Sequence, residues 1–155
     1  MKLNPETDLT FTRTLNAPRA LLWECWTMPS HVEKFFVPKP HSIDHCEIDL
    51  RVGGRFNTVM NVDGNKMANE GVYLEVEEGK RLVFTDTYSE GWKPAADPFM
   101  TAIIEFEDDG NGGTTYTATA RHRSAEARKS HEEMGFLDGW GTVATQLEEY
   151  ANSLR

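Results

Sequence analysis

Three polar side chains, Glu70, Asp86 and His122, fall among the inward-facing positions of predicted strands. A histidine beside a carboxylate can act as a general acid and base, and burial or a like charge would raise the pKa of a carboxylic acid. The simpler interpretation is structural, because a buried polar group needs a partner, and either acid could pair with His122 or with Arg55. We favour the structural interpretation and keep a catalytic role open for all three residues.

A second set of possible ligands, His41, His45 and Cys46, does not predict a metal site. The two histidines lie four residues apart in a predicted strand, so their Cα atoms are roughly 13 Å apart and their side chains should face solvent. Cys25 and Cys46 show no CxxC spacing, and we expect two buried, reduced thiols. No cofactor is expected, because the sequence has no P-loop, dinucleotide fingerprint or nucleophile elbow.

Large apolar side chains are the most numerous candidates for contacting a ligand. Ligand sites are mostly apolar, with a few polar groups among the lining residues. Trp92 lies in a predicted loop and Phe36 beside a proline turn, so both are placed to form the rim of a cavity. The residues expected to contact a ligand are Phe35, Phe36, Met60, Phe84, Trp92, Phe99, Tyr116, His122, Leu137 and Trp140.

Strands fill the chain between two helical regions. Residues 7–17 alternate as a strand does, and two short amphipathic helices are predicted after them, over residues 19–27 and 30–37. Alternation and turn sequences predict further strands over residues 42–52, 55–62, 67–78, 81–90, 99–108 and 114–123. Residues from about 124 to 154 form the last helix. Consecutive strands with tight turns give an antiparallel sheet, which this helix is long enough to cover.

Strand alternation also predicts which side chains face the last helix. Most of them are apolar, and small residues at 118 and 120 make the last strand narrow in its middle. The inward-facing apolar residues of the later strands are Phe56, Met60, Val72, Leu74, Val76, Leu82, Phe84, Ile104, Phe106 and Tyr116. On the strand before them, Cys46, Ile48, Leu50 and Val52 share one face.

Three glycines, Gly135, Gly139 and Gly141, stand in the last helical region, where each costs roughly 1 kcal/mol relative to alanine. Gly139 and Gly141 flank Trp140. Either they let the helix pack closely on the sheet, or the helix stands away from the sheet and Trp140 forms the wall of a cavity; we favour packing and keep the cavity open. Residues 130–133 match a capping box, so the helix should kink or restart near residue 134, with Gly135 as the break.

The chain resembles a known family in four segments that occur in the same order: WECWTMPSHVEKFFVP, DLRVGGRF, EGVYLEVEEGKRLVFTDT and GFLDGWGTVATQLEEY. The family is named for the C-terminal domain of the Hsp90 ATPase activator and belongs to the START/Bet v 1-like superfamily. Family members often carry paired tryptophans where this chain has Phe35 and Phe36, so two indole N–H donors are replaced.

This resemblance implies an α+β helix-grip fold over residues 1–155 as a single domain. In that fold a curved antiparallel sheet of about six or seven strands wraps around a long C-terminal helix, with two short helices after the first strand. It also implies a cavity between the sheet and the helix. The order of elements in this fold matches the order predicted from the residues.

Composition narrows the expected class of partner. The net charge of −9 argues against nucleic acid and against an anionic membrane surface, because both need clustered lysine and arginine. No apolar run is long enough to span a bilayer, and the start, MKLNPETD, lacks a signal-peptide pattern, so we expect a cytoplasmic protein. The eukaryotic activator has a separate N-terminal domain that this chain lacks, so Hsp90 is not expected as a partner.

Three functional hypotheses follow. The first is binding of a small hydrophobic or aromatic molecule in a cavity between the sheet and the C-terminal helix. The alternative is an enzyme of the polyketide cyclase or hydrolase kind that uses His122 with Asp86 or Glu70. The third is a protein-interaction module, which needs an exposed apolar patch outside the cavity. The polar outward faces of the strands argue against the third.

Overall fold

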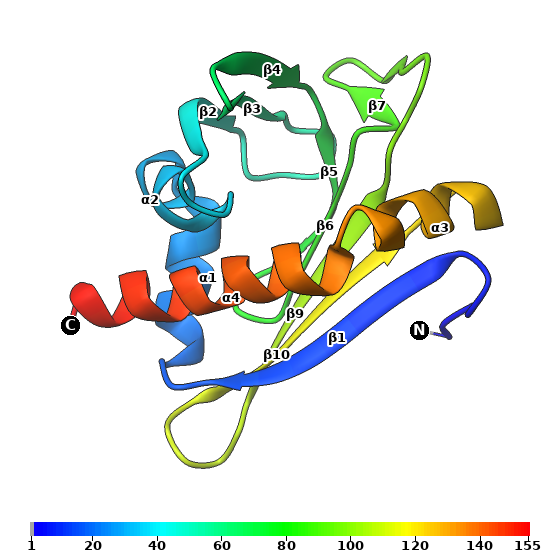
Figure 1. Cartoon of the computed structure of the whole chain (residues 1–155). Helices are drawn as coiled ribbons and strands as arrows, with labels where there is room; N and C mark the ends of the chain where they lie inside the picture. The colour runs from blue at the N-terminus through cyan, green and yellow to red at the C-terminus, as the bar shows by residue number, and fades with distance from the viewer. Residues whose placement is uncertain (1) are drawn as a thin grey trace.

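The computed structural model describes residues 2–155 and shows strands curved around a long helix (Figure 1). The helices are α1 (Arg19–Thr27), α2 (Pro29–Phe35), α3 (Ala125–Glu133) and α4 (Phe136–Ser153). The strands are β1 (Asp8–Leu15), β2 (Ser42–Ile48), β3 (Phe56–Val62), β4 (Asn65–Asn69), β5 (Val72–Glu77), β6 (Arg81–Thr85), β7 (Tyr88–Ser89), β8 (Lys93–Pro94), β9 (Thr101–Asp108) and β10 (Thr114–Arg121). No helix within residues 2–155 is both long and apolar enough to cross a membrane.

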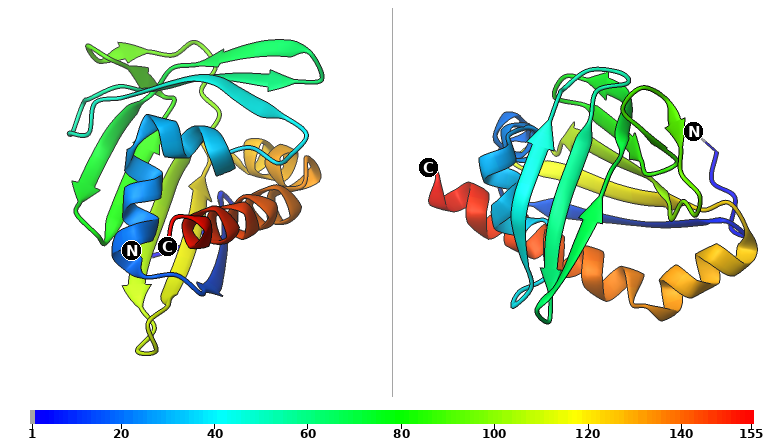
Figure 2. Two further views of the ribbon diagram at one scale, coloured as in Figure 1. Left: turned by 90° about the vertical axis from the view of Figure 1, so that its left-hand side faces the viewer. Right: turned by 90° about the horizontal axis from the view of Figure 1, so that it is seen from above.

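The strands form three antiparallel groups. The largest sheet has the order β1-β10-β9-β6-β5, a second has the order β2-β3-β4, and β7 pairs with β8. Helix α4 lies along one face of the five-stranded sheet, and the three-stranded sheet stands across the end of that sheet at which β5 lies (Figures 1 and 2). This arrangement confirms the predicted α+β helix-grip fold, with the strands divided between sheets.

Two adjacent glycines, Gly53 and Gly54, form the corner between the two larger sheets. The Gly53 N–H donates to the Tyr73 carbonyl at 2.8 Å, and the Tyr73 N–H donates to the Gly54 carbonyl at 3.0 Å. Gly53 has a φ of +81°, and a Cβ at Gly54 would lie 2.0 Å from the Asp49 carbonyl oxygen. Both positions therefore require glycine, for different reasons.

The predicted strand over residues 67–78 is in fact two strands in different sheets. β4 pairs with β3, whereas β5 pairs with β6, and Gly71 lies between them. A Cβ at Gly71 would lie 2.5 Å from the Thr85 carbonyl oxygen, so the chain passes this point only without a side chain. The continuous alternation of the sequence hides this change of sheet.

Three residues expected to face inward are exposed instead. A bulge between Tyr73 and Glu75 shifts the alternation of β5, so Tyr73 is buried and Leu74 is exposed. Leu50 and Val52 are exposed because β2 ends before them. The predicted strand over 81–90 likewise ends early, at the end of β6.

The C-terminal helical region is divided at Gly135, where the sequence predicts a break. Gly135 has a φ of +93° and separates α3 from α4. The cap of α3 is Ser124, whose hydroxyl oxygen accepts a hydrogen bond from the Ala127 N–H at 3.1 Å. The capping box predicted at Ser130 is therefore wrong, because Ser130 lies inside α3.

Both cysteines are buried and free, as predicted. Burial raises the pKa of the Cys25 thiol to about 11, and nearby Glu24 adds to this. Burial likewise raises the pKa of Cys46 to about 12, with Glu33 and Glu47 adding to it. Because the thiolate is the nucleophilic form, both side chains are unreactive core residues.

Candidate ligand-binding cavity

A cavity with two lobes lies between α4, the three-stranded sheet and β6. The lobe of about 230 Å³ beside α4, called the helix lobe, is lined by Phe36, Pro38, Met60, Phe99, Met100, His131, Met134, Gly135, Phe136, Gly139, Trp140 and Val143. The lobe of about 460 Å³ beside the strands, called the sheet lobe, is lined by Phe36, Phe56, Thr58, Met60, Met67, Asn69, Glu70, Gly71, Phe84, Thr85, Asp86, Asp97, Phe99, Met100 and Met134. The lobes share five lining residues and are therefore adjacent.

Methionine is unusually frequent in the cavity wall. Four of the six methionines of the chain, Met60, Met67, Met100 and Met134, line one lobe or both. The thioether side chain is unbranched and polarizable, so it adapts its shape to a neighbouring group. Of these four, only Met60 was a predicted ligand contact. Met67 and Met100 lie within two residues of the start of a predicted strand, and Met134 lies beside the predicted break in the last helix, so periodicity gives these three little direction.

Five of the ten residues expected to contact a ligand line this cavity. They are Phe36, Met60, Phe84, Phe99 and Trp140. The Phe36 ring lies between the lobes, with its centroid 6.3 Å from that of Trp140 and 5.8 Å from that of Phe56. These five residues therefore remain candidates for contact with a ligand.

Four other expected contacts do not line either lobe. Phe35 and Tyr116 are fully buried in the core. Trp92 is 53% exposed and contacts Tyr88, with a separation of 5.8 Å between ring centroids. Leu137 is 64% exposed and lines a separate surface groove beside β1. Leu137 belongs to the first turn of α4, and there it lies beside the N-terminal segment and not beside the cavity.

The two glycines that flank Trp140 have different roles. A Cβ at Gly139 would meet nothing within 4 Å, and Gly139 lines the helix lobe. A Cβ at Gly141 would lie 3.1 Å from Arg13 Nη2, while Arg13 Nη1 donates to Thr145 Oγ1 at 2.8 Å. Gly141 is thus a packing position, whereas Gly139 leaves space. The packing interpretation therefore fits Gly141, and the cavity interpretation fits Gly139.

The predicted acid–base set is not assembled. Glu70 and Asp86 line the sheet lobe, but within residues 2–155 no hydrogen bond or ion pair joins either acid to His122 or to Arg55. The Asp86 carboxylate instead accepts hydrogen bonds at 2.8 to 3.1 Å from the two backbone N–H groups just before β9. It therefore fixes the segment that carries Phe99 into the cavity, and the catalytic hypothesis for these residues loses its geometry.

The residues considered for a metal site point in different directions. His45 is exposed, 3.8 Å from Glu47, whereas Cys46 is buried. Residues 2–155 contain no group of three or more histidine, cysteine, aspartate or glutamate side chains that could hold a metal ion.

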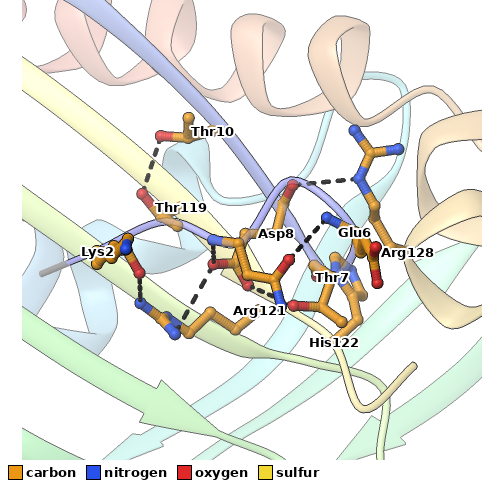
Figure 3. Close-up of polar contacts among 10 residues, drawn as sticks. Lys2, Glu6, Thr7, Asp8, Thr10, Thr119, Arg121, His122 and Arg128 are labelled. Carbon is orange, nitrogen blue, oxygen red and sulfur yellow. Dashed lines mark hydrogen bonds and ion pairs between the residues drawn. The ribbon is translucent and has the colours of Figure 1, made fainter. Parts of the chain in front are cut away.

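His122 is paired with His131, a buried residue of α3. His122 Nδ1 lies 2.8 Å from the Thr7 carbonyl oxygen, and its Nε2 lies 2.8 Å from His131 Nδ1. Figure 3 shows His122 beside Thr7 and Asp8, at the start of β1. Both histidines are buried. No sequence pattern predicts this pair, because one residue follows a strand and the other lies in the next helix.

His131 also lines the helix lobe, where aromatic rings surround it. Its ring centroid lies 4.6 Å from that of Phe99 and 5.2 Å from that of Phe136. Burial lowers the pKa of His131 to about 4, and the adjacent His122 adds to this. The His131 imidazole is therefore neutral at neutral pH.

This lowered pKa predicts a loss of stability in acid. Because the unfolded chain binds a proton at His131 near pH 6.5 and the folded chain only near pH 4, the contribution is complete above pH 6.5 and is lost as the pH falls toward 4. The free energy of unfolding of the wild type should fall between pH 7 and pH 4. In His131→Phe we expect this fall to be smaller by roughly 2 kcal/mol, because the variant has no imidazole to protonate there. Urea unfolding of both proteins across this range measures the difference, and parallel curves would contradict the prediction.

Gln146 holds one wall of the cavity in place. Its side-chain amide donates to the carbonyls of Phe35 at 2.9 Å and Val37 at 2.8 Å, and accepts from the Lys39 N–H at 2.9 Å. These bonds attach the segment that carries Phe36 to α4. Sequence analysis did not single out Gln146, although a polar residue within the apolar stripe of a helix is a signal that could have identified it.

The curved sheet around α4, with an open cavity between sheet and helix, defines a protein of the helix-grip class, the START/Bet v 1-like fold. The chain belongs to the family of activator of Hsp90 ATPase homolog 1-like proteins, whose model matches residues 16–152. No curated protein matches the chain.

Solved structures show the same relationship. A protein from Nitrosomonas europaea is 46% identical, with a TM-score of 0.95 and 98% of each chain covered. A protein from Mycobacterium smegmatis is 30% identical, with a TM-score of 0.78, and the match covers 94% of this chain and 90% of that one. An AHSA1-like protein from Aeromonas hydrophila, 17% identical with a TM-score of 0.71, shares the fold over 95% of this chain and 93% of its own.

Proposed function

We propose that this chain binds a small apolar or aromatic molecule in the two-lobed cavity. The observation that carries the proposal is the hollow itself. The sheet lobe alone, at about 460 Å³, falls within the range of roughly 300 to 1,000 Å³ typical of ligand sites. Its wall combines aromatic rings and methionines with a few polar groups, which is the usual composition of such sites.

The exposure of two lining residues supports an entrance from solvent. Phe99 and Met134 line both lobes, and they are 38% and 71% exposed. Large apolar side chains at a surface opening are well placed to meet an apolar molecule as it enters.

The charges of the lining residues favour a ligand without negative charge. Glu70, Asp86 and Asp97 line the sheet lobe, and no lysine or arginine of the described chain lines either lobe. A ligand that carries a carboxylate would lose water from that group on binding and would gain no cationic partner in the cavity, which is unfavourable. We therefore infer a neutral ligand.

Two tryptophans provide an internal comparison for a binding experiment. Naphthalene and indole would be titrated into ¹⁵N-labelled protein, and the indole N–H signals followed by NMR. We expect the Trp140 signal to shift, because Trp140 lines the helix lobe, and the signal of exposed Trp92 to stay unchanged. Equal shifts at both, or none at either, would contradict a specific site. Native mass spectrometry of protein from its own host would then seek the natural ligand.

Filling the helix lobe from α4 should block binding without unfolding the protein. A leucine at position 139 would extend into space in which a Cβ meets nothing within 4 Å, so we expect Gly139→Leu to weaken naphthalene binding at least about tenfold. Gly139→Ala is the matched control. It should raise the free energy of unfolding by about 0.5 to 1 kcal/mol, because alanine is the better helix former, with little loss of binding. Calorimetric titration and urea unfolding measure both. Unchanged naphthalene affinity in Gly139→Leu would exclude the helix lobe from the site.

A further inference from the structure

We propose that His131 Nε2 is the polar anchor of the cavity, accepting a hydrogen bond from a hydroxyl or N–H group on an otherwise aromatic ligand such as a phenol or an indole. This inference rests on the proposed function and names the chemical class of its ligand. Three features support it: the hydrogen bonds of the pair His122 and His131, the position of His131 in the wall of the helix lobe, and the aromatic rings around His131.

The hydrogen-bond chain determines which nitrogen atoms of the pair carry protons. The Thr7 carbonyl oxygen only accepts, so His122 Nδ1, 2.8 Å away, must carry a hydrogen (Figure 3). In a neutral imidazole the other nitrogen is then an acceptor, so His122 Nε2 accepts from His131 Nδ1 at 2.8 Å. His131 Nδ1 is therefore the protonated nitrogen of its ring, and His131 Nε2 has a free lone pair.

This free acceptor belongs to a residue in the wall of the helix lobe. Among the described residues that line this lobe, His131 is the only one with an ionisable side chain, and it is 6% exposed. The hydrogen bonds of residues 2–155 include none to His131 Nε2. The buried side-chain atoms of residues 2–155 that lack a partner do not include His131 Nε2, so this nitrogen reaches the solvent of the open lobe, where a donor on a ligand would take the place of water.

The neutral state of His131 determines what that group can be. A protonated imidazole would attract a carboxylate, but the pKa of His131 is lowered to about 4 by burial and by His122. A neutral nitrogen with a lone pair pairs instead with a donor. The surrounding rings of Phe99 and Phe136 then favour an aromatic body for the rest of the ligand.

The test compares two molecules that differ only in a donor, 2-naphthol and 2-methylnaphthalene, in wild type and in His131→Phe. The methyl group replaces the hydroxyl at similar size, so the ratio of the two dissociation constants isolates the hydrogen bond. In His131→Phe we expect the dissociation constant of 2-naphthol to rise about tenfold relative to that of 2-methylnaphthalene, which should still bind. His45→Phe, at an exposed histidine, is the matched control and should leave the ratio unchanged.

A second measurement needs no variant. In ¹⁵N NMR of the wild-type histidine rings, the signal of His131 Nε2 should shift when 2-naphthol is added and stay nearly constant with 2-methylnaphthalene.

The outcomes separate the anchor from the proposed function. If neither compound binds the wild type, the proposed function fails and the anchor fails with it. If 2-methylnaphthalene binds but the ratio is the same in His131→Phe, the cavity holds and only the anchor is overturned. A preference for 2-naphthol that survives in His131→Phe and disappears in Trp140→Phe would place the hydroxyl on the indole N–H, and would also overturn the anchor.

Discussion

Replacing Gly54 with alanine is expected to lower the free energy of unfolding by roughly 3 kcal/mol. The new methyl carbon would lie 2.0 Å from the Asp49 carbonyl oxygen, so the backbone at the corner between the two sheets must move. That movement strains the two backbone hydrogen bonds that join Gly53 and Gly54 to Tyr73. Urea unfolding monitored by tryptophan fluorescence measures the loss.

Gly64→Ala is the matched control for this substitution. Gly64 has a φ of +84° in the turn between β3 and β4, but a Cβ there would meet nothing within 4 Å. Its replacement by alanine should lower the free energy of unfolding by only about 1 kcal/mol, because only the left-handed backbone conformation is unfavourable for alanine there. If Gly54→Ala costs no more than Gly64→Ala, the close approach of Asp49 is not what requires glycine at the corner.

Gln146→Leu is expected to lower the free energy of unfolding by about 3 kcal/mol and to weaken ligand binding. Leucine suits the apolar stripe of α4, but it leaves the carbonyls of Phe35 and Val37 and the Lys39 N–H without their partner. The segment that carries Phe36 into both lobes would then be held less firmly. Urea unfolding measures the first effect and calorimetric titration with naphthalene the second.

The control for Gln146→Leu is Glu149→Leu, which places the same side chain on the exposed side of the same helix. Its effect should stay within about 0.5 kcal/mol, as for most surface substitutions. A loss of less than about 1 kcal/mol in Gln146→Leu would show that water replaces the amide at low cost, and that the segment is held by its apolar contacts.

Much of the fold can be predicted from the sequence, because alternation and helical periodicity follow directly from which face of an element is buried. β1, β9 and β10 lie close to their predicted bounds for this reason, and so does the break at Gly135. The division between β4 and β5 is different. Gly71 is required there by the Thr85 carbonyl oxygen on another strand, a contact that no local pattern contains. The bulge that exposes Leu74 has the same kind of cause.

The cavity was only partly predictable, and the reason is geometric. Aromatic residues on strands, such as Phe84, have a direction given by alternation. Residues in loops and at element ends have none, so the sequence alone does not separate Trp92, which lines neither lobe, from Met134, which lines both. His131 became important only through His122, and a contact between two histidines nine residues apart depends on how α3 packs against β1.

The corner at Gly53 and Gly54 also sets where the cavity can be long. Bridges at Val52–Tyr73 and Arg55–Val72 flank the corner, and the Phe56 N–H donates to the Gly71 carbonyl at 2.9 Å, so the three-stranded sheet is joined to β5 along one edge. The sheet lobe, lined by residues of both sheets, is the larger of the two at about 460 Å³, whereas the helix lobe has about 230 Å³. In a series of ligands that share one head group and grow in length, we expect the sheet lobe to take up the added length, while the helix lobe sets how the head group is held.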